Sequence, residues 1–384
     1  ITDHAANIEL SYLKPASHCG HGYSRRVIVE DSREKLQIAS ASKQERPGDT
    51  VPALYVGAYR RPSRASMVVY EIFDGAVSTE VIGHKKKVHC VAWNLSGRRL
   101  ASGSVDQSTR VWDVEHGSRP GKELELKGHS DSVDQVCWDP TSAERLVTVS
   151  GDKTLRAWDV RSGSKCVATV NTSGENINLA WHPDGSIVAV SDRDDVVSFV
   201  DTRKHRVIGT QKFPLELNEM CWSPSGGVLW VTTGLGTVEV HSWPLSRRLL
   251  SIKAHAAGCY AIDIDPSGQR VALGGADTLV SLWDAVDYTC LHTVTRLDKP
   301  VRAVRFSKGG DFIATGSEEN FIDISDAQTG ECAVRLLAGA ATDSLAWSPT
   351  EYIIAYVGDA QPANIDKYAR TAVKIWGVPS TRMV

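Results

Sequence analysis

The sequence lacks a long hydrophobic run: no apolar stretch approaches the roughly 18 residues that a membrane-spanning helix needs. It also lacks a strong net charge, because 43 Lys and Arg stand against 46 Asp and Glu, for a formal net charge of -3. No global field therefore draws the protein to nucleic acid or to an anionic membrane. We expect no membrane partner, and we expect any RNA contact to be weak, local or made through another protein.

Signatures of catalysis and of cofactor binding are absent as well. Ser, His and Asp occur together repeatedly, but no GxSxG turn or comparable exposed elbow accompanies them. The stretch "GLGTVE" from Gly234 lacks the third glycine of a dinucleotide loop, and "DRDDVV" from Asp192 lacks the glycine and distal glutamate of a calcium loop. We therefore predict a protein that is not an enzyme and that uses no cofactor, metal or small-molecule substrate.

Cysteine is present, but never in the CxxC spacing of a zinc or redox motif. Three of the eight cysteines, Cys90, Cys137 and Cys221, lie inside apolar runs that read as strands. A free cysteine behaves as a small buried hydrophobe. We expect reduced core thiols rather than zinc ligands or disulfides.

What the sequence does contain is a repeat. The stretch "TLRAWDV", which ends at Val160, belongs to a set of seven similar stretches, among them "STRVWDV" ending at Val114 and "LVSLWDA" ending at Ala285. A second series runs in step with the first, with 41 to 45 positions between successive members. Its members are Trp93, Trp138, Trp181, Trp222, Ile264, Phe306 and Trp347. A period of this length is typical of one blade of a β-propeller.

Turn-forming residues divide each copy into short strands. Segments such as "HPDGS" and "DPSGQ" follow the members of the second series and contain the Pro, Gly, Asp and Ser that favour tight turns. These turns predict four short strands in each copy. Seven such sheets can bury both of their faces by packing around a common axis. The last copy lacks a fourth strand, which "AVSTEVIG" (residues 76–83) can supply. We predict an all-β, seven-bladed β-propeller closed by an N-terminal strand.

The repeats resemble those of WD-repeat proteins, with "GH" at residues 83–84 and 128–129 and "WD" at 112–113, 158–159 and 283–284. The resemblance implies that a His, a strand Ser or Thr, a turn Asp and a strand Trp hydrogen-bond together and stabilise a blade. The matching residues are His84, Ser102, Asp106 and Trp112 in blade 1, His129, Thr148, Asp152 and Trp158 in blade 2, and His255, Asp277 and Trp283 in blade 5. Blade 5 has Leu273 in the hydroxyl position, and in the other four blades we expect packing alone to suffice.

A closer resemblance is to the family of WD-repeat subunits of the THO complex, THO subunit 3. It covers about residues 79–377 and includes segments outside the generic repeat, notably "GENIN" (174–178) and "EENFIDI" (318–324). The family implies a nuclear scaffold in the THO and TREX (transcription-export) assembly. Such a scaffold couples transcription to the packaging and export of mRNA, and in some lineages it is linked to small-RNA pathways. The implied partners are the other THO and TREX subunits.

Two groups of polar residues are candidate partner contacts. Glu175, Asn176 and Asn178 stand at the entry to the third blade, where the "GH" element is missing. The alternative is that the two Asn side chains cap this turn locally. The second group is the basic run Lys85, Lys86 and Lys87. This run would contact RNA phosphate or an acidic partner, or it is an ordinary solvated loop.

One motif predicts a different function. "WDVR", ending at Arg161, fits the "WDxR" box that in another set of WD-repeat proteins docks the propeller to the adaptor of a cullin-type ubiquitin ligase, and "VDTR", ending at Arg203, is a weaker second copy. An Arg after such a strand also arises by chance in a polar turn. We keep the role of ubiquitin-ligase substrate receptor as the alternative, with Arg161 as the contact residue.

The first 66 residues contain no repeat and no long apolar periodicity. Clusters such as "SKQERPGD" and "YRRPSRAS" indicate a flexible, basic segment. The first Met is Met67, shortly before the closing strand. We therefore expect residues 1–66 to be a disordered or non-native extension and residues 67–384 to hold the propeller. Peptides from residues 1–60 of the endogenous protein would contradict a start at Met67.

Overall fold

The computed structural model describes residues 72–115, 119–244, 247–358 and 372–378, and all of them belong to one compact unit. The predicted extension 1–66 and its boundary at Met67 lie outside the described residues. The described chain forms seven four-stranded antiparallel sheets. A 3-10 turn, η1 (Val160–Ser162), lies among the strands, and no helix among the described residues is long and apolar enough to cross a membrane.

The strands follow the predicted order. Blade 1 holds β2 (Val88–Trp93), β3 (Arg99–Ser104), β4 (Ser108–Glu115) and β5 (Arg119–Lys127). Blade 2 holds β6 (Val133–Trp138), β7 (Arg145–Ser150), β8 (Thr154–Asp159) and β9 (Cys166–Asn171). Blade 3 holds β10 (Asn176–Trp181), β11 (Ile187–Asp192), β12 (Val196–Asp201) and β13 (Arg206–Lys212). Blade 4 holds β14 (Leu217–Trp222), β15 (Val228–Thr233), β16 (Thr237–Ser242) and β17 (Arg248–Lys253).

The remaining strands complete the set. Blade 5 holds β18 (Cys259–Ile264), β19 (Arg270–Gly275), β20 (Val280–Asp284) and β21 (Cys290–Val294). Blade 6 holds β22 (Val301–Phe306), β23 (Phe312–Ser317), β24 (Phe321–Asp326) and β25 (Cys332–Leu337). Blade 7 holds β26 (Ser344–Trp347), β27 (Ile353–Val357), β28 (Ala372–Gly377) and β1 (Val77–Ile82). The hairpins turn where the sequence places its turn residues: between β18 and β19, Gly268 has φ 72°, which a residue with a Cβ rarely adopts.

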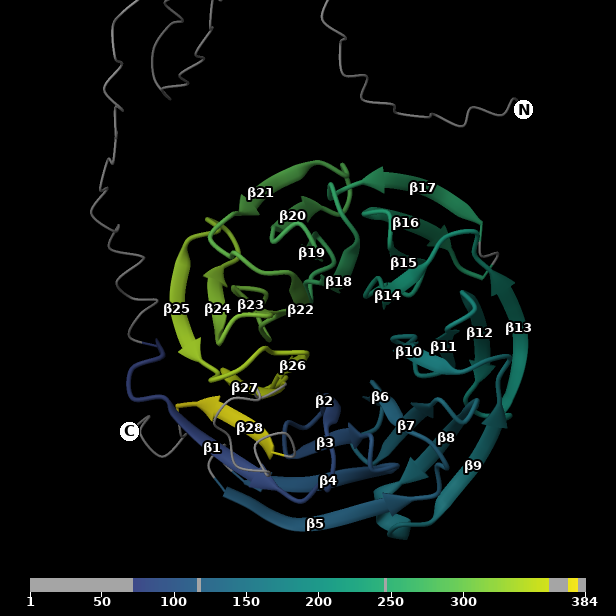
Figure 1. Ribbon diagram of the computed structural model, residues 1–384. Helices are drawn as coiled ribbons and strands as arrows, with labels where there is room; N and C mark the ends of the chain where they lie inside the picture. The colour runs from purple at the N-terminus through teal and green to yellow at the C-terminus, as the bar shows by residue number, and fades with distance from the viewer. Residues whose placement is uncertain (1–71, 116–118, 245–246, 359–371, 379–384) are drawn as a thin grey trace, which may run out of the picture. The chain divides into compact units, whose positions relative to one another are not determined.

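The seven sheets stand around a central axis, with the first strand of each innermost (Figure 1). Each innermost strand contacts the innermost strands of the blades on either side, and β26 contacts β2, so the ring is continuous. The prediction of a seven-bladed propeller is confirmed.

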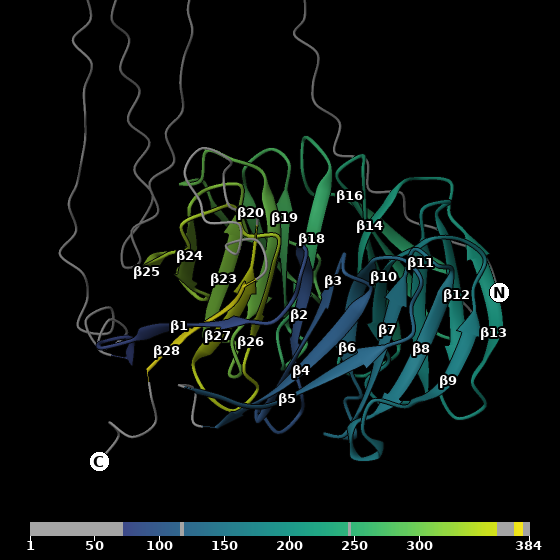
Figure 2. The same ribbon diagram turned by 60° about the horizontal axis from the view of Figure 1, so that its bottom comes forward.

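The closing strand is also confirmed. Strand β1 pairs antiparallel with β28 and becomes the outermost strand of blade 7, so that Val77 lies opposite Gly377 and Ile82 opposite Ala372 (Figure 2). The seventh sheet therefore contains both ends of the described chain. An edge that would otherwise leave main-chain groups unpaired is covered in this way.

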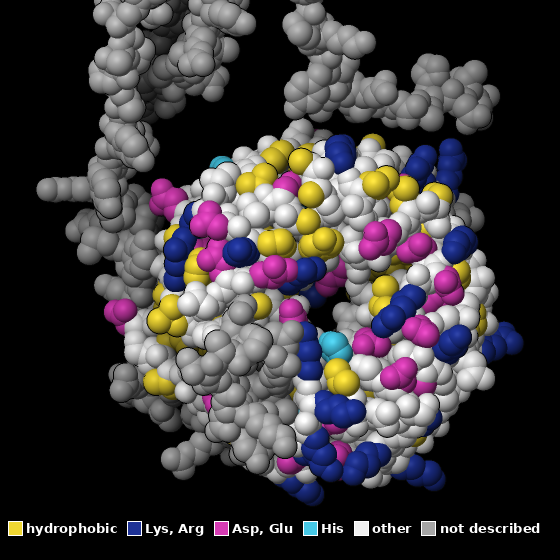
Figure 3. All heavy atoms as spheres, in the orientation of Figure 1, with side chains coloured by type: hydrophobic (Ala, Val, Ile, Leu, Met, Phe, Trp, Pro, Cys, Tyr) yellow, Lys and Arg dark blue, Asp and Glu magenta, His cyan; other side chains and the backbone are white. Residues whose placement is uncertain are grey.

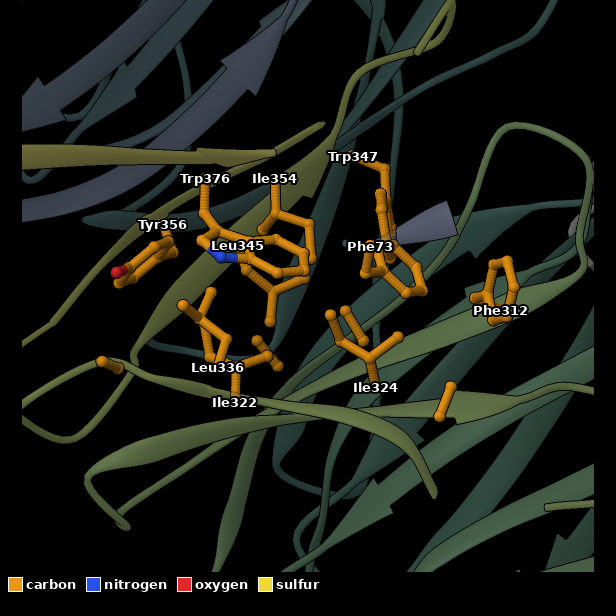
Figure 4. Close-up of a cluster of buried hydrophobic side chains, with 14 residues drawn as sticks. Phe73, Phe312, Ile322, Ile324, Leu336, Leu345, Trp347, Ile354, Tyr356 and Trp376 are labelled. Atoms are coloured by element: carbon orange, nitrogen blue, oxygen red, sulfur yellow. The ribbon is translucent and has the colours of Figure 1, made fainter. Parts of the chain in front are cut away.

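A buried aromatic residue just before β1 reinforces this closure. Phe73 is 6% exposed and packs against side chains of blades 6 and 7 (Figure 4). Its ring lies 5.2 Å from that of Phe312 and 5.4 Å from that of Trp376, between ring centroids. The sequence pattern placed the start of the closing element at residue 76 and missed this anchor.

The tryptophans of the second series join neighbouring blades. Four of them donate their indole N–H to a main-chain carbonyl on the innermost strand of the preceding blade. The bonds are Trp93 to Ala346 (3.2 Å), Trp138 to Ala92 (3.0 Å), Trp222 to Ala180 (3.1 Å) and Trp347 to Arg305 (3.1 Å). The period of 41 to 45 residues thus marks both the packing of each blade and its attachment to the next one.

Candidate functional site

The predicted network of blade 2 is a continuous chain of hydrogen bonds. The His129 ring lies 2.8 Å (Nδ1) from a carboxylate oxygen of Asp152 and 2.7 Å (Nε2) from the Thr148 hydroxyl. Because a carboxylate only accepts, Nδ1–H donates and Nε2 accepts from Thr148. The Thr148 oxygen in turn accepts the indole N–H of Trp158 at 2.9 Å. Four side chains, from the entry loop, strand β7, the turn after it and strand β8, are therefore held in one geometry.

Blade 1 repeats this arrangement with Ser102 in place of the threonine. His84 Nδ1 lies 3.0 Å from Asp106, and its Nε2 lies 2.7 Å from the Ser102 hydroxyl. The ring of Trp112 meets the His84 ring edge-on, with 5.8 Å between centroids. Burial favours the protonated carboxyl of Asp106, but hydrogen bonds from His84, Ser108 and the Lys85 amide outweigh it and hold the Asp106 pKa well below its usual range.

The ionisable pair of blade 2 makes stability sensitive to acid. Burial lowers the pKa of His129 despite its bond to Asp152. At Asp152, burial alone would raise the pKa, but the hydrogen bonds from Thr154 and His129 outweigh burial and lower the pKa. Both directions mean that the unfolded state binds more protons, so this pair makes the free energy of unfolding fall as the pH drops below about 6.5.

Blade 5 shows how the network survives without its strand hydroxyl. Leu273 occupies the expected position, but Ser281 on the facing strand β20 supplies the missing group. Its hydroxyl lies 2.9 Å from His255 Nε2 and accepts the Trp283 indole N–H at 2.7 Å, while His255 Nδ1 lies 2.8 Å from Asp277. Ser281, opposite Leu273 on the neighbouring strand, therefore replaces the strand hydroxyl that His255 and Trp283 would otherwise share.

Blade 6 uses the same facing position for a buried charge. Asp323 on β24 is fully buried and lies opposite Thr315. Arg296, from the loop before the blade, reaches Asp323 through Nη2 at 2.7 Å and Nε at 2.9 Å, and also reaches Ser325 and the Gly330 carbonyl. Our expectation that packing alone holds this blade is wrong, because an arginine and an aspartate replace the histidine and the hydroxyl.

Blade 4 carries a further variant at this strand position. Glu239 is 3% exposed, lies 3.2 Å from His241 Nε2 and accepts from Arg248 at 3.2 Å. The bond to His241 lowers the Glu239 pKa against the opposing effect of burial, and Arg248 adds to this lowering. The sequence signal is one acidic residue inside an otherwise apolar strand, as in "TVEVHS" and "FIDISD".

Removing only the shared hydroxyl of blade 2 tests whether the network stabilises the ring. Thr148→Val keeps the shape but leaves His129 and Trp158 without a common partner, so we expect the free energy of unfolding to fall by about 2–3 kcal/mol. Thr210→Val, on an exposed strand position, should change it by less than about 0.5 kcal/mol. Urea unfolding of both variants measures the difference. Equal stabilities would contradict a stabilising role.

The candidate contacts at the entry of blade 3 divide into two kinds. Glu175 is exposed and lies 3.3 Å from Arg193. Asn176 is 1% exposed and donates to the Ser150 carbonyl of blade 2 at 3.3 Å. Asn178 is 7% exposed and donates across the next boundary, to a main-chain carbonyl of β14, at 2.8 Å. Partner contact is therefore wrong for both Asn residues, since their bonds join blades. Asn176 also accepts from the Thr172 hydroxyl of its own turn at 2.8 Å, which agrees with the alternative of local capping.

The other candidate contacts lie nearer the surface. Lys85 and Lys86 are exposed, whereas Lys87 is half-buried and pairs with Asp343 of blade 7 at 2.8 Å. Arg161 has a 69% exposed side chain, but its guanidinium is held by Asp159 through Nε at 3.0 Å and Nη2 at 2.6 Å. Of the basic run, Lys85 and Lys86 are the two free to meet a partner.

Charged groups line the centre of the ring, where Figure 3 shows an opening. Glu219 of blade 4 accepts from the Ile262 amide at 2.8 Å and from Arg305 of blade 6 at 2.5 Å. Asp263, between them on blade 5, accepts from the Phe306 amide at 2.7 Å. Burial raises the Asp263 pKa to about 6, against the opposing charge of Arg305. These hydrogen bonds and charges join the innermost strands of three consecutive blades.

Asp263 predicts a pH dependence of the opposite sign to that of blade 2. Its raised pKa means that the folded state holds a proton that the unfolded chain has lost, so its contribution to stability is lost as the pH rises from about 4 to 6. Asp263→Asn should remove this loss, which amounts to up to about 3 kcal/mol. Urea unfolding between pH 4.5 and 7 measures it. Asp194→Asn, at an exposed carboxylate, is the control that should leave the profile unchanged.

The comparisons with known proteins identify the family. The model of the THOC3 beta-propeller domain matches residues 84–357. THO complex subunit 3 of Arabidopsis thaliana is 51% identical over 288 residues, which are 75% of this chain and 91% of that protein. The chain belongs to the THOC3 beta-propeller family. The THOC3 match spans blades 1 to 6 and the first two strands of blade 7.

More distant relatives share the repeat but not this degree of identity. WD repeat-containing protein AAC3 of Dictyostelium discoideum is 31% identical over 322 residues, 78% of this chain and 67% of that protein. Pre-mRNA-processing factor 19 homolog 2 of Arabidopsis thaliana is 26% identical over 269 residues, 68% of this chain and 50% of that protein. The THOC3 family assignment gives the ubiquitin-ligase alternative no support. The anchor Phe73 and the closing pair of β1 and β28 lie outside the matched range.

Proposed function

We propose that the protein is a non-enzymatic scaffold subunit of a nuclear THO complex. The observation that carries the proposal is the 51% identity with a THO complex subunit 3 of which the match covers 91%. In this role it holds other THO and TREX subunits together while transcripts are packaged and passed to export, and it serves small-RNA pathways where these use the same assembly. Contact with RNA is indirect or weak.

The architecture supports a scaffold. A ring closed by its own first strand offers two faces and a rim of loops on a rigid support, which suits the simultaneous docking of several partners. Among the described residues, no three His, Cys, Asp or Glu side chains gather to hold a metal ion. The His and the Ser or Thr of the sets in blades 1, 2 and 5 are buried, and each set is engaged in hydrogen bonds within its own blade.

Affinity purification from nuclear extract tests the proposal. The tagged full chain is recovered after nuclease treatment, so that RNA does not bridge proteins, and bound proteins are quantified by mass spectrometry. We expect the other THO subunits in near-stoichiometric amounts, and unchanged recovery with Arg161→Ala. Their absence would overturn the scaffold role, as would recovery of a cullin and its adaptor in their place.

A further inference from the structure

A cavity lies between blades 2 and 3, at the end of the sheets where their third strands turn into the fourth. Its volume is about 230 Å³, close to the space that one large apolar side chain fills. Its walls are mainly apolar, with Leu155 and Trp158 from blade 2 and Val188 and Val200 from blade 3. Val167, on the outer strand β9, also lines it and is 55% exposed, so the cavity is reached from the surface.

One buried donor on the wall of this cavity has no acceptor. Trp181 belongs to the same series as the tryptophans that bond to the preceding blade, and it lines the cavity. Its Nε1 is buried, and no group among the described residues lies within hydrogen-bond distance of it. A buried indole N–H without an acceptor is costly.

The rim of the cavity is basic. Arg145, Arg203, Asp139 and Asp159 line it. Asp139 pairs with Arg145 at 2.7 Å and Asp159 with Arg161 at 2.6 Å, whereas Arg203 is exposed with no carboxylate partner among the described residues. Lys204 and Arg206 stand beside Arg203 on the same turn and are also exposed. The nearby carboxylate of Asp201 is occupied by the amides of its own turn. The field at the mouth is therefore positive, while the chain as a whole carries a net charge of -3.

We propose that this cavity docks a short acidic segment of a partner protein, with one large apolar side chain inserted between blades 2 and 3. Carboxylates flanking the inserted residue pair with Arg203 and its neighbours, and the inserted side chain contacts the wall to which Trp181 belongs. The apolar walls favour a peptide over RNA, because a nucleic acid offers phosphates to the rim but no aliphatic group to fill the cavity. The proposal rests on the scaffold function, since it names one surface through which an assembled partner is held.

Site-specific photo-crosslinking in the purified assembly tests it. The residue p-benzoylphenylalanine replaces Val167 in the tagged full chain, and the same replacement at Val286, which is 71% exposed on blade 5, is the control position. After irradiation, peptides attached to each position are identified by mass spectrometry. We expect the Val167 position to capture an acidic peptide of another subunit that contains a Leu, Ile, Met, Phe or Trp. Capture of RNA, of this chain alone or of nothing would overturn the proposal.

Variants separate docking from folding. Arg203→Glu should lower the crosslink yield at least fivefold, and Lys122→Glu, at an exposed position of blade 1, should leave it unchanged. Trp181→Phe should lower the yield without shifting the urea midpoint, because no bond within the chain is lost. Trp222→Phe, which loses its bond to Ala180, should shift the midpoint and spare the yield. Equal yields in all four variants would overturn the proposal.

The two proposals fail in different ways. If the THO subunits are recovered with the tagged chain but none is crosslinked at the Val167 position, the scaffold function stands and the docking site is wrong. If no THO subunit is recovered, the scaffold function itself is wrong.

Discussion

Replacing Phe73 with Ala should lower the free energy of unfolding by about 3–5 kcal/mol, the usual cost of removing a buried aromatic side chain. The ring of Phe73 fills the space between Phe312 and Trp376 and so ties the start of the closing strand to blades 6 and 7. Its loss leaves a cavity at the seam of the ring. Urea unfolding of the purified protein measures the change.

The place where Phe73→Ala destabilises the structure is as informative as the fall in the free energy of unfolding. Hydrogen exchange should speed up first in β1 and β28, because the seam then opens without the rest of the ring. Val77→Ala, on the same closing element but at a side chain that is 46% exposed, should cost less than about 1 kcal/mol. If Phe73→Ala and Val77→Ala cost the same, the aromatic anchor contributes nothing to closure.

Removing the buried carboxylate of blade 6 should be comparably harmful. Asp323→Ala takes away the group that Arg296 binds at 2.7 Å, and it leaves a half-buried guanidinium without its main partner. Breaking such a pair from one side typically costs about 3–5 kcal/mol. Thermal and urea unfolding should both show the loss, and Asp323→Asn, which keeps an acceptor, should be milder.

Two comparisons isolate the pair from a general loss of charge. Glu318→Ala removes an exposed carboxylate of the same blade that pairs with Arg302 at 2.5 Å, and it should cost less than about 1 kcal/mol. The double change Asp323→Ala with Arg296→Ala should cost less than the sum of the two single changes, since each removes the same interaction. Strict additivity would show that Arg296 and Asp323 do not act together.

The fold could be predicted from the sequence because the features that mark each blade lie close together along the chain. Alternating apolar residues, a bulky residue every 41 to 45 positions and turn residues between them recur seven times, and these features are set by neighbours in sequence. The three predicted networks lie in blades 1, 2 and 5, whose His, Asp and Trp spacing survives. The closing strand could be predicted from the strand missing at the other end.

The polar contacts that replace the strand hydroxyl in blades 4, 5 and 6 could not be predicted in the same way. In blades 1 and 2 the strand position facing the network hydroxyl holds Arg110 and Arg156, whereas blades 4, 5 and 6 place Glu239, Ser281 and Asp323 there. The polar group has moved across a strand pair, and its partner differs from blade to blade. His255 and Arg296 come from the loop before their blades, whereas His241 and Arg248, which contact Glu239, lie on strands. Such pairs depend on contacts between distant residues, which a single sequence does not display.

The entry of blade 3 was misread for a related reason. Asn176 and Asn178 are polar residues beside a turn, which ordinarily indicates exposure or capping. The bulge between these two residues and the close approach of the neighbouring blades bury both. Their side-chain N–H groups donate to main-chain carbonyls of blades 2 and 4, and a main-chain partner leaves no mark in the residue types.

The pairing of β1 with β28 has a consequence for the synthesis of the protein. About 300 residues separate the two strands along the chain. At about 5–20 residues per second, a ribosome needs roughly 15 to 60 s to make that length. Throughout this interval β1 has emerged without the strand that it pairs with, so blade 7 is completed only once β28 has been made.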